Sequence, residues 1–370
     1  MLSELLLSGW DALTEYLSAH VLTCLIPAFF IAGAIAVFVS QTAVIRYFGP
    51  HAKRWIAYTV ASLSGAILAV CSCTILPLFA GIRQRGAGLG PAITFLYSGP
   101  AINVLAILYS AQLLGVDLGI ARAVAAIVFS VVIGIIMALL FRRAEEKLYS
   151  ENEDWAYGSG DDGSHPMRQI IPYFAAMVVF LVAASSIALV VNVMQSEPGR
   201  WALVFEGNPV PAGIALVFLV AIIVMVVRWY SGHEVSQWMT ETWSLIKKIV
   251  PILLLGVFIA GIIKALLPEA VVQRWVGGNS LQHNLLASLF GALMYFSTLT
   301  EVPIVRALMD LGMGKGPALT LLLAGPSLSL PNMIVIGRVM GAKRTAAYVV
   351  LVIVLSTLVG MIFGQFFPSA

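Results

Sequence analysis

Ten runs of about 20 apolar residues follow one another along the 370-residue chain. A helix of that length is long enough to cross the roughly 30 Å hydrocarbon core of a bilayer. Only 11% of the residues are charged, whereas a soluble domain has about 25%. The sequence therefore predicts an all-α integral membrane protein of about ten transmembrane helices and excludes an ordinary soluble enzyme. The expected spans are about 21–40, 56–79, 90–112, 119–141, 170–194, 210–229, 247–267, 283–304, 316–338 and 344–367.

One segment occurs twice. Residues 61–100 and 287–326 align without gaps at an offset of 226, with 16 of 40 positions identical. We expect two repeats, and their parallel or inverted relation depends on whether every span crosses fully. Four regions follow: 1–141, a first repeat with an interfacial N-terminus; 142–169, a charged flexible linker; 170–229, a connecting pair of spans; and 230–370, the second repeat. Residues 142–168 hold 11 of the 39 charged residues (21 basic and 18 acidic), which is typical of a solvated linker.

Glycine and proline interrupt the apolar runs at matching positions of both copies. Pro77 corresponds to Pro303, and the SGP of 98–100 corresponds to the AGP of 324–326. Such breaks leave backbone N–H and C=O groups without helical hydrogen bonds. A membrane protein tolerates this only where other protein groups or a water-filled cavity provide hydrogen-bond partners. Paired breaks of this kind mark the binding sites of secondary transporters. We therefore expect discontinuous or hairpin-like helices at the midplane. The candidate substrate-binding residues there are Ser98, Gly99, Pro100, Asn103, Gly325, Pro326 and Asn332.

A pair of cysteines precedes the first break. Cys71 and Cys73 would face the same side if the backbone there is unwound before Pro77. Two thiolates at one point form a soft site for a thiophilic ion or for trivalent arsenic. The alternative is that both are small residues that let helices approach closely. Ser72 lies between them and is a further substrate-binding candidate, as are the two cysteines. Cys24 is interpreted as a small buried hydrophobe.

The second copy has no cysteines in this segment and carries an acid instead of an isoleucine. Glu301 aligns with Ile75 and lies between apolar residues. An intramembrane carboxylate is costly and marks a functional site by default, and burial favours its neutral form. Glu301 is therefore a candidate proton-coupling residue, the alternative being a structural charge neutralised by Arg306 or by a helix N-terminus. Three hydroxyl-bearing neighbours are further substrate-binding candidates: Ser297, Thr298 and Thr300.

The segments around both breaks resemble a bacterial predicted-permease family that includes the organoarsenical exporter ArsP. The resemblance is carried by CSCTILPLFAGIRQRGAGLGPAITFLYSGPAINVLAI (71–107) and by AGPSLSLPNMIVIGR (324–338). It implies a polytopic inner-membrane permease, with some relatives linked to efflux of arsenic compounds through membrane-embedded cysteines. Those cysteines would be Cys71 and Cys73.

Together these features predict a secondary transporter, not an enzyme, in the inner (plasma) membrane. We expect it to move a small soft or thiol-reactive solute, coupled to protons through Glu301. The alternatives are a permease for a small anion held by half-helix N-termini and a membrane thiol–disulfide enzyme. The glycine-rich loops lack the GK[ST] ending of a phosphate loop, and the net charge of +3 is too scattered for nucleic acid. The expected partners are the lipid bilayer and a small solute or ion, and no cofactor. A homo-oligomer stays open.

Overall fold

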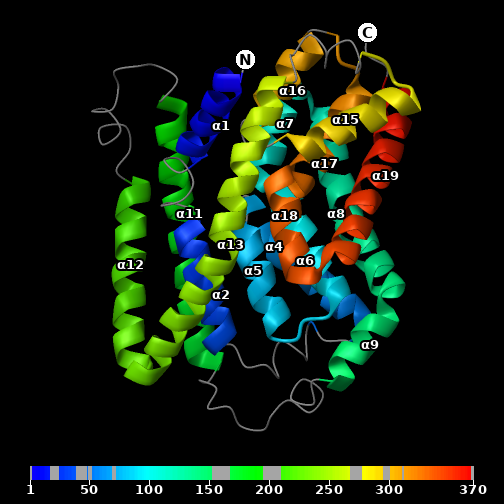
Figure 1. Ribbon diagram of the computed structural model, residues 1–370. Coiled ribbons are helices and arrows are strands. Elements are labelled where there is room, and N and C mark those ends of the chain that lie inside the picture. Colours follow the sequence, from blue (N-terminus) through cyan, green and yellow to red (C-terminus); the bar gives the residue numbers. More distant parts are fainter. Residues whose placement is uncertain are drawn as a thin grey trace.

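The computed structural model describes ten stretches of the chain: residues 2–16, 25–38, 48, 52–68, 72–151, 167–194, 210–266, 277–294, 301–310 and 312–367. All regular secondary structure in these stretches is helical. Figure 1 shows the helices as an upright bundle, in which α12 stands at one edge and contacts α11. The architecture is therefore all-α, as the composition predicts.

Eight helices precede residue 152 in the described chain. They are α1 (Leu2–Tyr16), α2 (Ile26–Phe38), α4 (Arg54–Leu68), α5 (Ser72–Gln84), α6 (Leu89–Ala101), α7 (Val104–Leu114), α8 (Val116–Leu140) and α9 (Arg142–Glu151). Eight follow residue 166 in the described chain. They are α11 (Met167–Met194), α12 (Val210–Trp229), α13 (Gly232–Leu266), α15 (Leu281–Leu293), α16 (Glu301–Asp310), α17 (Lys315–Leu328), α18 (Leu330–Met340) and α19 (Ala342–Phe366).

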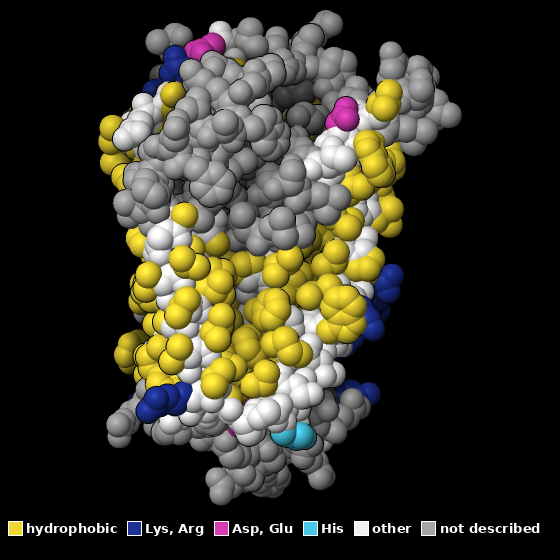
Figure 2. Space-filling view, turned by 90° about the vertical axis from the view of Figure 1, so that its left-hand side faces the viewer, with side chains coloured by type: hydrophobic (Ala, Val, Ile, Leu, Met, Phe, Trp, Pro, Cys, Tyr) yellow, Lys and Arg dark blue, Asp and Glu magenta, His cyan; other side chains and the backbone are white. Residues whose placement is uncertain are grey.

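Four of the described helices are individually long and apolar enough to cross a membrane, and the number rises to six if each of two bent pairs counts as one span. The four lie within α8, α12, α13 and α19. Large apolar side chains on α12, among them Leu216, Val217 and Ile223, are more than half exposed. Figure 2 shows a band of hydrophobic side chains across the middle of one face, with lysine and arginine near its border. This surface suits a bilayer, while the count of ten spans stays a prediction.

The two bent pairs contain the breaks of the repeated segment. The axes of α6 and α7 differ by 45°, and those of α17 and α18 differ by 46°. The helices stop just after the SGP and AGP motifs, at Ile102–Asn103 and at Ser329. Pro77, in contrast, lies inside α5, which is helical from Ser72 onward. The unwinding that we expected before Pro77 is therefore not found in the described part of that segment.

Equivalent backbone features recur at the offset of 226. Four described glycines have positive φ, and they form two such pairs: Gly86 (87°) with Gly312 (102°), and Gly115 (111°) with Gly341 (87°). Each of these glycines stands in a short connection between helices and has a positive φ, which glycine adopts more readily than other residues. The bounds of α8 and α19 also differ by 226 at both ends. The correspondence thus reaches past residue 100, where the aligned segment ends.

The helices α6 and α17 begin at opposite ends of α8. The backbone N–H of Leu89, the first residue of α6, donates to Glu145 of α9, which follows the C-terminal end of α8. Lys315, the first residue of α17, pairs with Asp117 in the first turn of α8. In Figure 1, α9 lies at the bottom of the bundle and α16 at the top. The two copies of the break therefore approach the centre from opposite sides.

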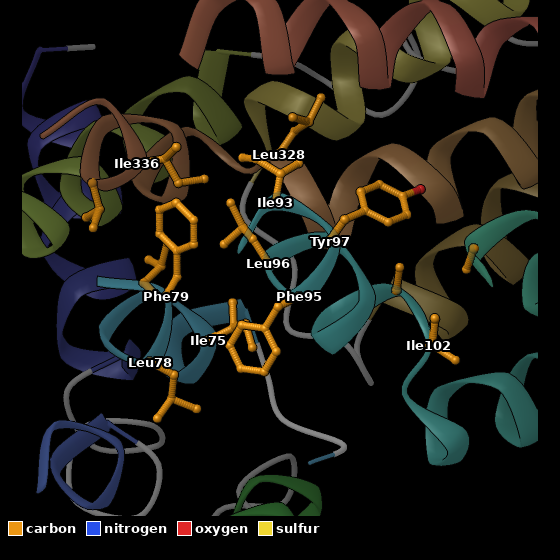
Figure 3. Packing of buried hydrophobic residues seen from close by; sticks show 14 of the residues in the cluster. Ile75, Leu78, Phe79, Ile93, Phe95, Leu96, Tyr97, Ile102, Leu328 and Ile336 are labelled. Atoms are coloured by element: carbon orange, nitrogen blue, oxygen red, sulfur yellow. The ribbon is translucent and has the colours of Figure 1, made fainter. Parts of the chain in front are cut away.

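The core between these helices is shared by both halves of the chain. Figure 3 shows Phe79 of α5 beside Ile336 of α18, and Leu96 and Ile93 of α6 below Leu328 of α17. All five side chains are at most 3% exposed. Because residues from before 152 and from after 166 fill one core, neither half buries its apolar face alone.

Two further regions add to the bundle. The helix α1 packs along α13, where the Ser8 hydroxyl donates to the Gly261 carbonyl at 3.0 Å. The expected linker at 142–169 opens with helix α9, in which Glu145 is buried. Most of what remains of it, residues 152–166, lies outside the described residues.

Candidate functional site

An ion pair without solvent contact lies between α8 and α16. Nη2 of Arg122 is 3.2 Å from Oε2 of Glu301, and both side chains are 0% exposed. Glu301 is the first residue of α16, and the dipole at the start of a helix also favours a negative charge. The intramembrane acid that the sequence singles out is therefore paired across the two halves of the chain.

The partner of Glu301 differs from the one that the sequence suggested. Arg306 forms an exposed ion pair with Asp310, one turn further along α16, at 2.9 Å. Arg122 was missed, although an arginine inside an apolar span is the same kind of signal as an intramembrane glutamate. Its sequence separation of 179 residues from Glu301 hid the pairing.

Hydrogen bonds hold the guanidinium of Arg122 on one side. Its Nη1 donates to the Ser110 hydroxyl at 2.8 Å, and that hydroxyl donates to the Ala106 carbonyl of α7 at 2.7 Å. Neither Nε of Arg122 nor Oε1 of Glu301 has a hydrogen-bond partner among the residues that the structure describes. A buried polar atom left in this way costs about 1–3 kcal/mol. The pair thus keeps one donor and one acceptor open for a further group.

Two buried tyrosines bond to the backbone of α17, and one of them, Tyr97, interacts with this pair. The Tyr97 hydroxyl donates to the Leu323 carbonyl at 3.3 Å and interacts electrostatically with both Arg122 and Glu301. The Tyr348 hydroxyl donates to the Ser327 carbonyl at 3.4 Å. Both phenols are 0% exposed, and Figure 3 shows the Tyr97 ring near the crossing of α6 and α17. The ion pair consequently lies beside the second break.

The predicted site residues of the first break are buried but are used by the fold. Ser98 donates to the carbonyls of Phe95 and Ala61, at 3.2 and 3.4 Å. Gly99 packs against Ile75 so closely that a Cβ would lie 2.8 Å from its Cδ1. The Asn103 side chain accepts from the Ala106 N–H and so caps α7. Pro100 lies inside α6. These contacts give structural roles to this set.

The predicted residues of the second break leave more hydrogen-bonding capacity. Gly325, Pro326 and Asn332 are all buried. The side-chain oxygens of Ser329 and Asn332 have no hydrogen-bond partner among the described residues. Among the described residues, the second break therefore keeps side-chain oxygens without a partner, and Tyr97, the residue before the first break, meets it at the Leu323 carbonyl.

The cysteine motif and the hydroxyl cluster before Glu301 cannot be placed. Cys71, Ser297, Thr298, Thr300 and Cys24 lie outside the described residues. Ser72 and Cys73 belong to the first turn of α5, but their side chains are not described. Among the described residues, no group of three or more His, Cys, Asp or Glu side chains could hold a metal ion. A thiol site at Cys71 and Cys73 therefore stays a prediction.

A second buried cluster of charges lies at the α9 end of the bundle. Glu145 accepts from Arg83 at 3.0 Å and from Arg344 at 3.1 Å, and it also accepts from the Leu89 N–H at 3.2 Å. One carboxylate of α9 thereby joins the end of α5 and the start of α6 to the start of α19. Sequence reasoning assigned this residue to a solvated linker and missed its role.

The comparisons with known proteins agree with this arrangement. A sequence profile described as a predicted permease, ArsP_1, matches residues 7–365. The chain belongs to this predicted-permease family. The resemblance seen in the sequence around both breaks is thereby confirmed, and the protein is a multi-pass membrane permease.

Two relatives of the permease were found in curated collections. The UPF0718 protein MJ0584 of Methanocaldococcus jannaschii is 44% identical over 356 residues, which cover 96% of this chain and 94% of the relative. The UPF0718 protein YraQ of Escherichia coli is 23% identical over 286 residues, or 77% of this chain and 60% of the relative. No solved structure matches the permease. The family membership thus supports transport across a membrane and leaves the solute to be inferred.

Proposed function

We propose that the permease is a proton-coupled secondary transporter of a small solute in the inner (plasma) membrane. The observation that carries this proposal is the Arg122–Glu301 pair, because it is fully buried and joins the two halves of the chain. Intramembrane charges of this kind line the solute and ion pathways of transporters. Glu301 would load a proton from one side and release it to the other.

The proposal includes two inverted repeats around a central site. Its support is the recurrence of helix bounds and of positive-φ glycines at the offset of 226, together with the opposite entry of α6 and α17. Transporters built in this way bind their solute where two discontinuous helices meet. The bends after the SGP and AGP motifs would be those discontinuities.

The alternating access of such a transporter requires each end of the site to open in turn. Two ion pairs link helices near opposite ends of α8: Asp117–Lys315 at its start, and Glu145–Arg344 beyond its other end. Each links helices from both halves of the chain. We propose that one of these two pairs separates in each open state.

For the cargo we propose a small soft or thiol-reactive solute such as an arsenical, held by Cys71 and Cys73, with efflux as the direction. The support is the softness of a dithiol and the family resemblance. The small-anion alternative is favoured by a specific observation, the buried Arg122 beside the second break. A thiol–disulfide enzyme is disfavoured, because two cysteines separated by one residue would form a strained disulfide.

The test uses purified permease in proteoliposomes with a trivalent arsenical as the probe. The wild type should accumulate the arsenical when a proton gradient is imposed. The Glu301→Gln variant should lose this uphill transport and keep the exchange of labelled arsenical. Asp310→Asn, which removes an exposed acid nine positions away on the same helix, is the matched control and should transport normally. Uphill transport by Glu301→Gln at the wild-type rate and pH dependence would contradict the role of Glu301.

A further inference from the structure

The Arg122–Glu301 pair has a charge balance that constrains what can bind there. Arg122 cannot lose its proton in a protein, and an uncompensated buried charge is very costly. The guanidinium therefore needs one negative partner in every state of the transport cycle. In the structure that partner is the carboxylate of Glu301, 3.2 Å away.

Arg122 has donors for more than this one partner. A guanidinium offers five N–H groups in a planar fork, and a carboxylate or other oxyanion binds best to two of them at once. Glu301 accepts from Nη2 through one oxygen, and Nε has no partner among the described residues. The observed contact is thus a one-oxygen contact on a group built for two. Tyr97 interacts electrostatically with both charges, but its hydroxyl already donates to the Leu323 carbonyl.

We propose that Arg122 is the recognition site for an anionic group of the cargo, and that Glu301 takes the place of that group in the empty permease. The inference rests on the proposed transport function and names its substrate class as a small monovalent anion with two oxygens, such as a carboxylate or an oxyanion. Its small size follows from the complete burial of Arg122, Glu301 and Tyr97.

Charge conservation then couples the anion to a proton. When the anion occupies Arg122, the carboxylate of Glu301 has lost its cation and must take up one proton to remain buried. The site is neutral before, with Arg122 and ionised Glu301, and neutral after, with Arg122, the anion and protonated Glu301. One anion and one proton therefore enter and leave together.

The other ionisable groups around the pair do not disturb this balance. Tyr97 of α6 and Tyr348 of α19 are buried phenols. Asp117 and Lys315, at the end of α8 and the start of α17, pair with each other at 2.7 Å. On α16, Arg306 and Asp310 form an exposed pair. In the described part of the chain, Glu301 is consequently the group that can exchange its charge with the anion.

The first test measures proton uptake by the full-length wild type in detergent, in weakly buffered solution with a pH indicator. The probe is formate, and the larger gluconate is the size control. Formate should bind with uptake of about one proton for each anion, and its affinity should fall about tenfold for each pH unit once Glu301 is ionised. Gluconate should neither bind nor change the pH. Formate binding without proton uptake, or no formate binding at all, would overturn the proposal.

The second test compares three variants, all purified in formate, which gives Arg122 of the Glu301→Gln variant an anion. Glu301→Gln should bind formate without proton uptake and should lose thermal stability when formate is removed. Arg122→Gln/Glu301→Gln keeps the site neutral and should fold but bind no formate. Arg122→Gln should bind none either. A merely structural ion pair predicts instead that formate affects none of these proteins, and that result would overturn the proposal.

Different results would contradict the proposed function and the anion site. Proton-driven transport of the arsenical with no formate-linked proton uptake would leave the proposed function standing and remove the anion site. Formate-linked proton uptake with no transport of any solute would remove the proposed function, while the anion site of Arg122 would stand.

Discussion

The Tyr97 hydroxyl donates a hydrogen bond to the backbone carbonyl of Leu323, and these residues occupy the same position in the two copies of the repeated segment, 226 residues apart. In a structure with two equivalent halves, a residue meets its own counterpart only near the axis that relates them. Tyr97 also interacts electrostatically with both members of the Arg122–Glu301 pair. The proposed transport site would therefore sit on the axis between the repeats.

Glycines at equivalent positions should be equally sensitive to substitution. A Cβ at Gly134 of α8 would lie 2.8 Å from the Gly90 carbonyl oxygen, and one at Gly360 of α19 would lie 2.7 Å from that of Gly316. Each also clashes with a threonine, Thr94 or Thr320, of the helix it packs on. Gly134→Ala and Gly360→Ala should each cost about 1–3 kcal/mol, measured as a lowered thermal unfolding midpoint.

The control for this comparison is Gly213→Ala in α12, where a Cβ would meet nothing within 4 Å. That variant should unfold at or slightly above the wild-type temperature, because alanine favours a helix over glycine. A large loss for Gly134→Ala with none for Gly360→Ala would contradict the equivalence of the two halves.

The Arg122–Glu301 pair should respond to single and double substitution in opposite ways. Removing one partner of a buried pair costs about 3–5 kcal/mol, whereas neutral replacement of both is often tolerated. In buffer without small anions, Arg122→Gln and Glu301→Gln should therefore unfold at clearly lower temperature than the wild type. The double variant should recover most of the loss. Equal, additive losses in a double-mutant cycle would show that the two side chains do not interact.

Glu145 should matter far more than its neighbour Glu146. Glu145 is buried and compensates Arg83 and Arg344, whereas Glu146 forms an exposed pair with Arg142 one turn away. Glu145→Gln leaves two arginines without their anion and should cost about 3 kcal/mol. Glu146→Gln should cost about 0.3–0.5 kcal/mol. Thermal unfolding of both variants checks this, and similar midpoints would mean that Glu145 does not hold the bundle end together.

The cysteine prediction can be separated from the ion pair by its own substitutions. If Cys71 and Cys73 hold a soft cargo, Cys71→Ser and Cys73→Ser should each abolish resistance of cells to a trivalent arsenical, because one thiolate binds a soft ion far more weakly than two. Cys24→Ser is the control and should leave resistance unchanged. Normal resistance in the Cys71/Cys73 double serine variant would leave the anion as the preferred cargo.

The sequence by itself determined the membrane class, the family and the place of the breaks. Apolar runs of about 20 residues indicate membrane-spanning helices, because a helix satisfies all of its own backbone groups in lipid. Glycine and proline indicate the breaks, because each residue's own φ preference acts locally. The glycines with positive φ stand in connections between helices: Gly86, Gly115, Gly312 and Gly341. Glu301 could also be recognised from the sequence, because an acid between apolar residues is costly in a membrane wherever its helix packs.

The tertiary structure decided which groups meet. Arg122 is 179 residues from Glu301, so no local pattern could show that they pair or that Arg306 turns to Asp310 instead. The tertiary structure also shows that the side chains of Ser98 and Asn103 hydrogen-bond to backbone groups of their own half of the chain. Glu145 lies within a run of charges that looks solvated, yet it is buried because α9 folds back on the starts of α6 and α19. The sequence shows that a charge inside an apolar span is costly to bury, whereas its compensating partner is determined by how the helices pack.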